Sequence, residues 1–147
     1  MGTLFTPTKY FEINQDKEIT DNLIEEILNQ NTDRIQVHLY KLKLTGKGWE
    51  RLNDKIFKVN PKISLRLYSG TELDLKFLNH LPDLEDLSLE LHTIKNGNEI
   101  SHLKKLKQLC IVSNQADFSF LDNLESPLES LFLATEESKN AKNDISV

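Results

Sequence analysis

The chain has 147 residues, of which 38% are hydrophobic, and a formal net charge of −5 at pH 7. This length allows one domain with a sizeable core, and the acidic balance argues against a nucleic-acid partner, which would favour a basic face. The only cysteine, Cys110, excludes an intramolecular disulfide, and no apolar run approaches the ~18 residues of a membrane span. We therefore expect a cytoplasmic protein without a membrane partner.

The N-terminal segment, residues 1–34, is predicted to be a cap with one helix. Met1–Thr6 matches the loose N-myristoylation pattern, which is short enough to occur by chance. Tyr10–Ile13 alternates weakly and allows a short edge strand. Ile19–Leu28 predicts a helix, for which either Thr20 or Asp21 can accept hydrogen bonds from the first turn. Its apolar face would consist of Leu23, Ile24, Ile27 and Leu28.

A strand and a longer helix are predicted next. Ile35–Leu39 alternates with period two, as a half-buried strand does, and the similar Ile63–Leu67 follows 28 residues later. The residues between them predict a helix that follows the turn Thr45–Gly48 and ends before Pro61. The apolar residues at helical spacing are Trp49, Leu52, Ile56 and Val59.

The most regular feature of the sequence is a 22-residue period. It is carried by Leu65, Leu87, Leu109 and Leu131, each followed two places on by Leu67, Leu89, Ile111 and Leu133. Self-similarity at a short fixed period is typical of a solenoid, in which each repeat buries its apolar edge against its neighbours. The segments between these pairs can hold only a turn or two of helix. Two of them, Leu75–Leu81 and Phe118–Leu124, share an apolar pattern.

Residues 106–124 carry the leucine pair and also Asn114, three places after Ile111. On these residues the chain resembles the leucine-rich repeat family, particularly its 22-residue bacterial kind. In that family the asparagine bonds backbone groups between adjacent repeats; the equivalent places here are Leu42, Gly70, His92 and Glu136, so only Asn114 keeps it.

The resemblance implies an α/β fold, a short leucine-rich repeat solenoid over residues 35–135. Its parallel sheet would be curved, with about five strands and with helices and short helical turns on the convex side. An ordinary α/β domain with coincidental spacing is the alternative. Residues 136–147 form a polar C-terminal tail. Either this tail covers the last repeat, or the final strand is exposed, or the chain is part of something longer.

Motifs for catalysis are missing from the sequence. Thr45–Gly48 lacks the leading glycine and the hydroxyl of a phosphate loop, and no Gly-x-Ser-x-Gly motif occurs. The four histidines, His38, His80, His92 and His102, have no metal-ligand spacing, although His80 and His102 stand 22 residues apart and could meet as a surface pair. We expect no catalytic residue, no metal and no cofactor.

The alternation of each strand also predicts a binding face. Side chains between the inward leucines must point outward, in rows of three. The first two rows are Gln36, His38, Tyr40 and Ser64, Arg66, Tyr68, which places Tyr40 beside Tyr68. Tyr and Arg are enriched at the energetic centres of interfaces. Equally, Tyr40 and Tyr68 could be a pair that only stabilises the sheet, and residues 136–147 could cover Phe132. The candidate protein-binding residues are His38, Tyr40, Arg66, Tyr68, Asp86, Glu90, Cys110, Val112 and Phe132.

The expected function is a non-enzymatic interaction module that binds a protein partner through its concave sheet. A bacterial toxin-neutralising immunity protein and an adaptor both fit this description. The alternative is a fragment or sensor region of a larger leucine-rich repeat signalling or NTPase assembly. We expect a monomer, with self-association through an uncapped C-terminal strand as a further option.

Overall fold

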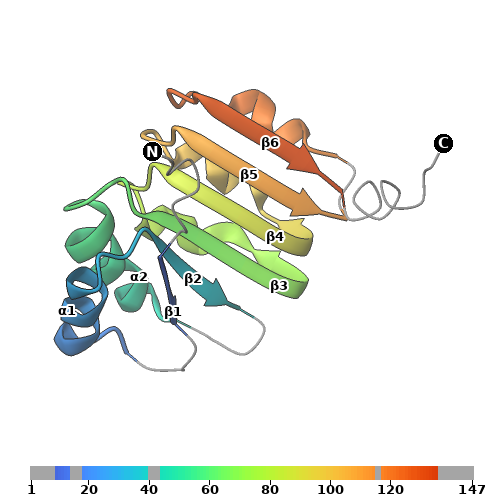
Figure 1. Cartoon of the computed structure of the whole chain (residues 1–147). Helices are drawn as coiled ribbons and strands as arrows, with labels where there is room; N and C mark the ends of the chain where they lie inside the picture. Colours follow the sequence, from blue (N-terminus) through green and yellow to red (C-terminus); the bar gives the residue numbers. More distant parts are fainter. Residues whose placement is uncertain (1–8, 14–17, 40–43, 115–116, 136–147) are drawn as a thin grey trace, which may run out of the picture.

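The computed structural model describes residues 9–13, 18–39, 44–114 and 117–135. Within these ranges the fold is α/β, with an open sheet of six parallel strands in the order β1-β2-β3-β4-β5-β6 (Figure 1). The strands are β1 (Tyr10–Ile13), β2 (Arg34–His38), β3 (Ser64–Asp74), β4 (Asp86–Lys95), β5 (Gln108–Ser113) and β6 (Ser130–Ala134). The predicted count of about five strands is wrong, because the weakly alternating Tyr10–Ile13 pairs with β2 as a sixth strand.

Helical segments connect successive strands and lie on one face of the sheet (Figure 1). They are the α-helices α1 (Asp21–Asn29) and α2 (Gly46–Leu52), the π-helical turn η2 (Asn53–Phe57), and the 3-10 helices η3 (Leu75–His80), η4 (Gly97–His102) and η5 (Ser119–Asn123). The two α-helices belong to the N-terminal connections, and the three later connections hold only short 3-10 helices, as the 22-residue spacing predicted. No helix in the described part of the chain is long and apolar enough to cross a membrane.

Side-chain caps fix where the α-helices begin. Thr20 accepts from the N–H of Leu23 at 3.2 Å, so it is Thr20 rather than Asp21 that caps α1. Thr45 accepts in the same way from the N–H of Gly48 and starts α2. The predicted apolar face of the second helix is correct except at Val59, which is 66% exposed because the helix ends before it.

The leucines of the 22-residue period lie side by side on the parallel strands, as predicted. One column of register partners is Leu65, Leu87, Leu109 and Leu131, and the next is Leu67, Leu89, Ile111 and Leu133. Both columns point toward the helical segments and are at most 2% exposed as far as β5. They form a single core that also includes Ile24 and Ile27 of α1.

The predicted alignment of β2 with β3 is wrong by two residues. Ile35 pairs with Leu65, 30 residues on, and not with Ile63, 28 residues on. Ile63 lies just before β3, where its N–H donates to the carbonyl of Asn60. It therefore resembles Leu84, which precedes β4 and bonds Leu81 in the same way. Because side chains alternate between the two faces of a strand, a register error of two residues leaves every side chain on its predicted face but changes its neighbours.

Candidate functional site

The sheet face opposite the helical segments, hereafter the strand face, carries the alternate side chains of every strand. One column of register partners runs through Glu12, Gln36, Arg66, Ser88, Cys110 and Phe132. The next runs through His38, Tyr68, Glu90, Val112 and Ala134. Neighbours within a column are about one strand spacing apart, ~4.8 Å, so their side chains touch. The N-terminal half of this face is charged and aromatic, and its β5–β6 half is uncharged.

Arg66 is the centre of the N-terminal half. Its guanidinium donates to Gln36 Oε1 at 3.2 Å and to Glu90 Oε2 at 2.5 Å. The same group lies 4.9 Å from the centroid of the Tyr68 ring, within the range of a cation–π contact. Arg66 is therefore held from three sides by side chains of β2, β3 and β4.

Tyr68 joins Arg66 to the first two strands. Its hydroxyl donates to Glu12 Oε1 at 2.5 Å, and its ring stacks on His38 with centroids 4.6 Å apart and planes 9° apart. The hydrogen bond to the Glu12 carboxylate, followed by burial, raises the pKa of Tyr68 to about 12. The phenol therefore stays neutral at physiological pH and keeps its proton as a donor. We call these six residues the Arg66–Tyr68 cluster: Glu12, Gln36, His38, Arg66, Tyr68 and Glu90.

The cluster differs from the predicted one in its N-terminal members. Tyr40, predicted beside Tyr68, lies outside the described residues. It is His38 that stacks on Tyr68, because each residue of β2 pairs with the residue of β3 two places after the predicted one. Glu12 and Gln36 were not predicted as site residues. The signal for Glu12 was the weak alternation of Tyr10–Ile13, which became informative only once that segment was known to be a strand.

Asp86 and Glu90 were predicted to form an acidic row that follows the aromatic and basic patch, and of the two only Glu90 belongs to the cluster. Asp86 pairs in register with Gln108 on β5, whereas Glu90 contacts Arg66. Burial raises the pKa of the Asp86 carboxyl, and the positive charge of Arg34 opposes this shift.

The β5–β6 half contains the three predicted apolar residues. Cys110 is the register partner of Phe132, and Val112 is the partner of Ala134. Cys110 and Val112 are half-buried, whereas Phe132 is 56% exposed. The structure thus brings together Cys110 and Phe132 as predicted, beside the polar cluster rather than within it.

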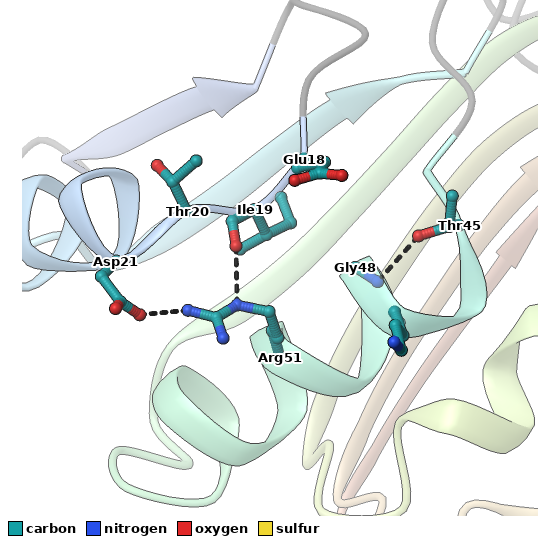
Figure 2. Close-up of a pocket in the computed structure, with 8 residues that line it drawn as sticks. Glu18, Ile19, Thr20, Asp21, Thr45, Gly48 and Arg51 are labelled. Carbon is teal, nitrogen blue, oxygen red and sulfur yellow. Dashed lines mark hydrogen bonds and ion pairs between the residues drawn. The ribbon is translucent and has the colours of Figure 1, made fainter.

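A pocket of about 570 Å³ lies elsewhere, between the starts of α1 and α2 (Figure 2). Arg51 reaches across it, donating from Nε to the carbonyl of Ile19 at 2.6 Å and pairing with Asp21. Because these bonds join the two helices, Arg51 has a structural role here. Sequence reasoning did not predict this pocket, which is lined by Glu18, Ile19, Thr20, Asp21, Thr45, Lys47, Gly48 and Arg51.

The described residues contain no group of three or more His, Cys, Asp or Glu side chains that could hold a metal ion. His80 and His102, which could have met as a pair, contact different glutamates: Glu50 and Glu99, each at 3.0 Å.

Comparisons of the chain with protein-family models, with curated proteins and with solved structures found no match. The class of the protein therefore follows from its geometry alone: an α/β protein with an open, all-parallel sheet in sequential strand order.

Proposed function

We propose that the chain is a short leucine-rich repeat solenoid that binds another protein through its strand face and catalyses no reaction. Sequential order of parallel strands and in-register leucines support the solenoid. The helical connections between strands are hereafter called the returns. The three short returns, which hold η3, η4 and η5, also repeat one contact: an apolar residue after the 3-10 helix donates its N–H to the carbonyl three residues back. These contacts are Leu81 to Leu78, Leu103 to Ile100 and Leu124 to Leu121.

The Arg66–Tyr68 cluster is the observation that supports a binding role. Arginine and tyrosine are the residue types most enriched at the energetic centres of interfaces, because they bury a large area and still form hydrogen bonds. The side chains of Arg66 and Glu90 are held by each other yet remain 28% and 33% exposed. A partner that docks here meets side chains already in place, so little conformational entropy is lost on binding.

The partner is best described by the two halves of the face. A protein segment that fits would bring polar groups to the cluster and apolar side chains to Cys110, Val112 and Phe132. A surface that binds one protein partner in this way suits a cytoplasmic, toxin-neutralising immunity protein or an adaptor. The only cysteine of the chain cannot form an internal disulfide, which suits a reducing compartment.

One observation favours a second candidate function. Leu131 and Leu133 face the side of the sheet on which the other leucines are buried, but they are 49% and 37% exposed. A further repeat stacked on β6 would bury them. The chain would then be a fragment or sensor region of a larger leucine-rich repeat signalling or NTPase assembly.

The binding role is tested by affinity capture from the native host with the full chain and two charge-matched variants. Arg66→Ala removes one positive charge from the cluster, and Lys55→Ala removes one from the exposed surface of η2. We expect Arg66→Ala to weaken capture of the specific partner by about 30-fold, a hot-spot effect of ~2 kcal/mol, and Lys55→Ala to leave it unchanged.

Thermal melting of both variants accompanies the capture. Equal capture by Arg66→Ala and Lys55→Ala, together with a large loss of stability only in Arg66→Ala, would show that the cluster stabilises the sheet and binds nothing.

A further inference from the structure

The strand β6 exposes apolar side chains on both of its faces. Leu131 and Leu133 on the helical side and Phe132 on the strand side are consecutive, and each is at least 37% exposed. The register partners of Leu131 and Leu133 in β5 are Leu109 and Ile111, which are 2% and 0% exposed. An exposed edge with such side chains is a template for pairing with another strand.

The hydrogen-bonding groups of β6 are arranged for one particular pairing. Ser130 donates its N–H to the carbonyl of Lys107 at 3.1 Å, on the β5 side. In a parallel ladder alternate residues bond the same neighbour, so Phe132 also directs its N–H and C=O toward β5. Leu131 and Leu133 direct theirs to the outer edge, where no described strand pairs with β6.

The sequence of β6 is symmetric about Phe132: small, Leu, Phe, Leu, small, from Ser130 to Ala134. We infer that two copies of this chain associate through an antiparallel pairing of their β6 strands, with Phe132 on the two-fold axis. Leu131 of each copy then lies opposite Leu133 of the other and exchanges both backbone hydrogen bonds with it. The inference rests on β6 and does not require a partner at the Arg66–Tyr68 cluster, although it shares Phe132 with the surface proposed for that partner.

This pairing buries the exposed apolar side chains on both faces of β6. The two Phe132 rings meet on the strand face, as a non-hydrogen-bonded pair with Cα atoms ~4.5 Å apart. Four leucines, two from each copy, meet on the helical side and join the two cores. The same patch is used by both copies, as a closed two-fold interface requires.

Electrostatics also favour a second copy as the occupant. No charged residue lies between Ser130 and Thr135, and the antiparallel register places Glu129 opposite Thr135, so no like charges face each other. The opposite edge differs, because β1 carries Glu12 within only four residues. Charges and short length are the devices that protect natural edge strands from pairing.

The interface is small, with five paired residues from each copy. It lies at the low end of interface sizes, below about 1,200 Å² in total, and interfaces of this size are typical of weak, transient association. We expect a dissociation constant in the micromolar range, with monomer and dimer in exchange.

Sedimentation velocity of the full chain, from low micromolar to near-millimolar concentration, measures this association. The wild type is expected to shift from monomer to dimer. Phe132→Lys and Phe132→Glu are each expected to remain monomeric, because the two-fold axis places each new charge opposite its own copy. An equimolar mixture of the two variants is expected to recover a dimer that contains one of each. The control is Val59→Lys, which changes another exposed apolar residue, away from β6, and is expected to leave dimerisation unchanged.

Cysteine cross-linking tests the register and works even if a charged variant folds poorly. In a Cys110→Ser background, Phe132→Cys is expected to form a disulfide-linked dimer on oxidation, because the two positions face each other. Leu131→Cys is expected not to, because in this register its Cα is more than ~7 Å from its counterpart, too far for a disulfide.

Three outcomes would overturn the inference. They are a wild-type monomer at every concentration, a dimer that survives both single charge variants, and a mixture of Phe132→Lys with Phe132→Glu that stays monomeric. Dimers that cross-link equally well from positions 131 and 132 would also contradict the proposed axis.

Discussion

The two ends of the sheet differ in how they bury the same kind of residue. At the N-terminal end, α1 packs Ile24 and Ile27 against the sheet, and even Ile13 of the edge strand β1 is only 4% exposed. At the C-terminal end, η5 has no buried residue, and Leu131 is 49% exposed although it continues the column of Leu87 and Leu109.

The difference shows that the leucine pattern alone does not determine burial. A leucine at this position is covered by the helical connections on both sides of its strand, and among the described residues β6 has such a connection on one side only. The length of the returns adds to the effect, because α1, α2 and η2 present whole helical turns to the core, whereas η3, η4 and η5 are 3-10 helices of five or six residues. We therefore expect stability to be concentrated toward the N-terminal strands.

The largest expected effect compares two leucines of one column. Leu89→Ala should lower the free energy of unfolding by ~2–5 kcal/mol, because it leaves a cavity in a fully buried site. Leu133→Ala should cost less than about 1 kcal/mol, because its side chain is already partly in water. Urea denaturation measures both. Equal losses would mean that β6 is covered in solution as completely as β4, and the comparison of the two ends would fail.

A second, intermediate effect concerns bonds between returns. Asn53 is buried and bridges to the next return, accepting from the N–H of Asp83 at 3.0 Å and donating to its carboxylate at 2.9 Å. Asn53→Ala should cost ~1–3 kcal/mol, because it leaves buried polar groups unpaired. Toward the other end, Lys104 contacts Glu125 at 3.4 Å with both side chains mostly exposed. Lys104→Ala should change the stability by less than about 0.5 kcal/mol in the same urea titration. Comparable losses from the two variants would contradict the proposed gradient.

The smallest expected effect is the pH dependence of stability, which should have opposite signs for the carboxylates of Asp83 and Asp86. Lys105, and then Asn53, lower the pKa of Asp83 below its ordinary value of 3.8, whereas burial raises that of Asp86. The ionised Asp83 therefore stabilises the fold above its ordinary pKa, and this contribution is lost as the pH falls through the lowered value. For Asp86 the sign is opposite, because the neutral form is favoured and the ionised form costs stability at neutral pH.

Denaturation at several pH values checks both signs. Asp83→Asn should destabilise the protein at pH 7, by an amount that shrinks in acid. Asp86→Asn should stabilise it at pH 7, by an amount that also shrinks in acid. A destabilising Asp86→Asn at neutral pH would show that the carboxylate has a partner that offsets its burial.

The sequence predicted the parts of the fold that depend on periodicity. The 22-residue period placed Leu87, Leu109 and Leu131 side by side, and the apolar spacing predicted α1 and the helix that contains Trp49. The period failed where the connection was longer. With no repeat of the same length to compare, the sequence pattern predicts Ile63 as the partner of Ile35, although Ile63 occupies the turn before β3.

The candidate site was less predictable than the fold. Alternation assigns side chains to a face, but contacts such as Tyr68 with Glu12, 56 residues apart in the chain, depend on the register of strands in between. A two-residue error moved His38 away from Tyr68 in the prediction and put Tyr40 there instead. No local pattern in the sequence marks these pairs, because each is made by side chains of different strands.

The close approach of neighbouring returns limits how this chain could grow by duplication. A Cβ atom at Gly97 would lie 2.7 Å from Phe120 on the following return, and one at Gly46 would lie 2.9 Å from His80 on the return after it. In both places a ring rests on backbone that has no side chain. A second copy of a 22-residue segment would fit into this chain only where the residue beneath such a ring is again glycine, so a lengthened variant must keep Gly97 and Phe120 on adjacent connections.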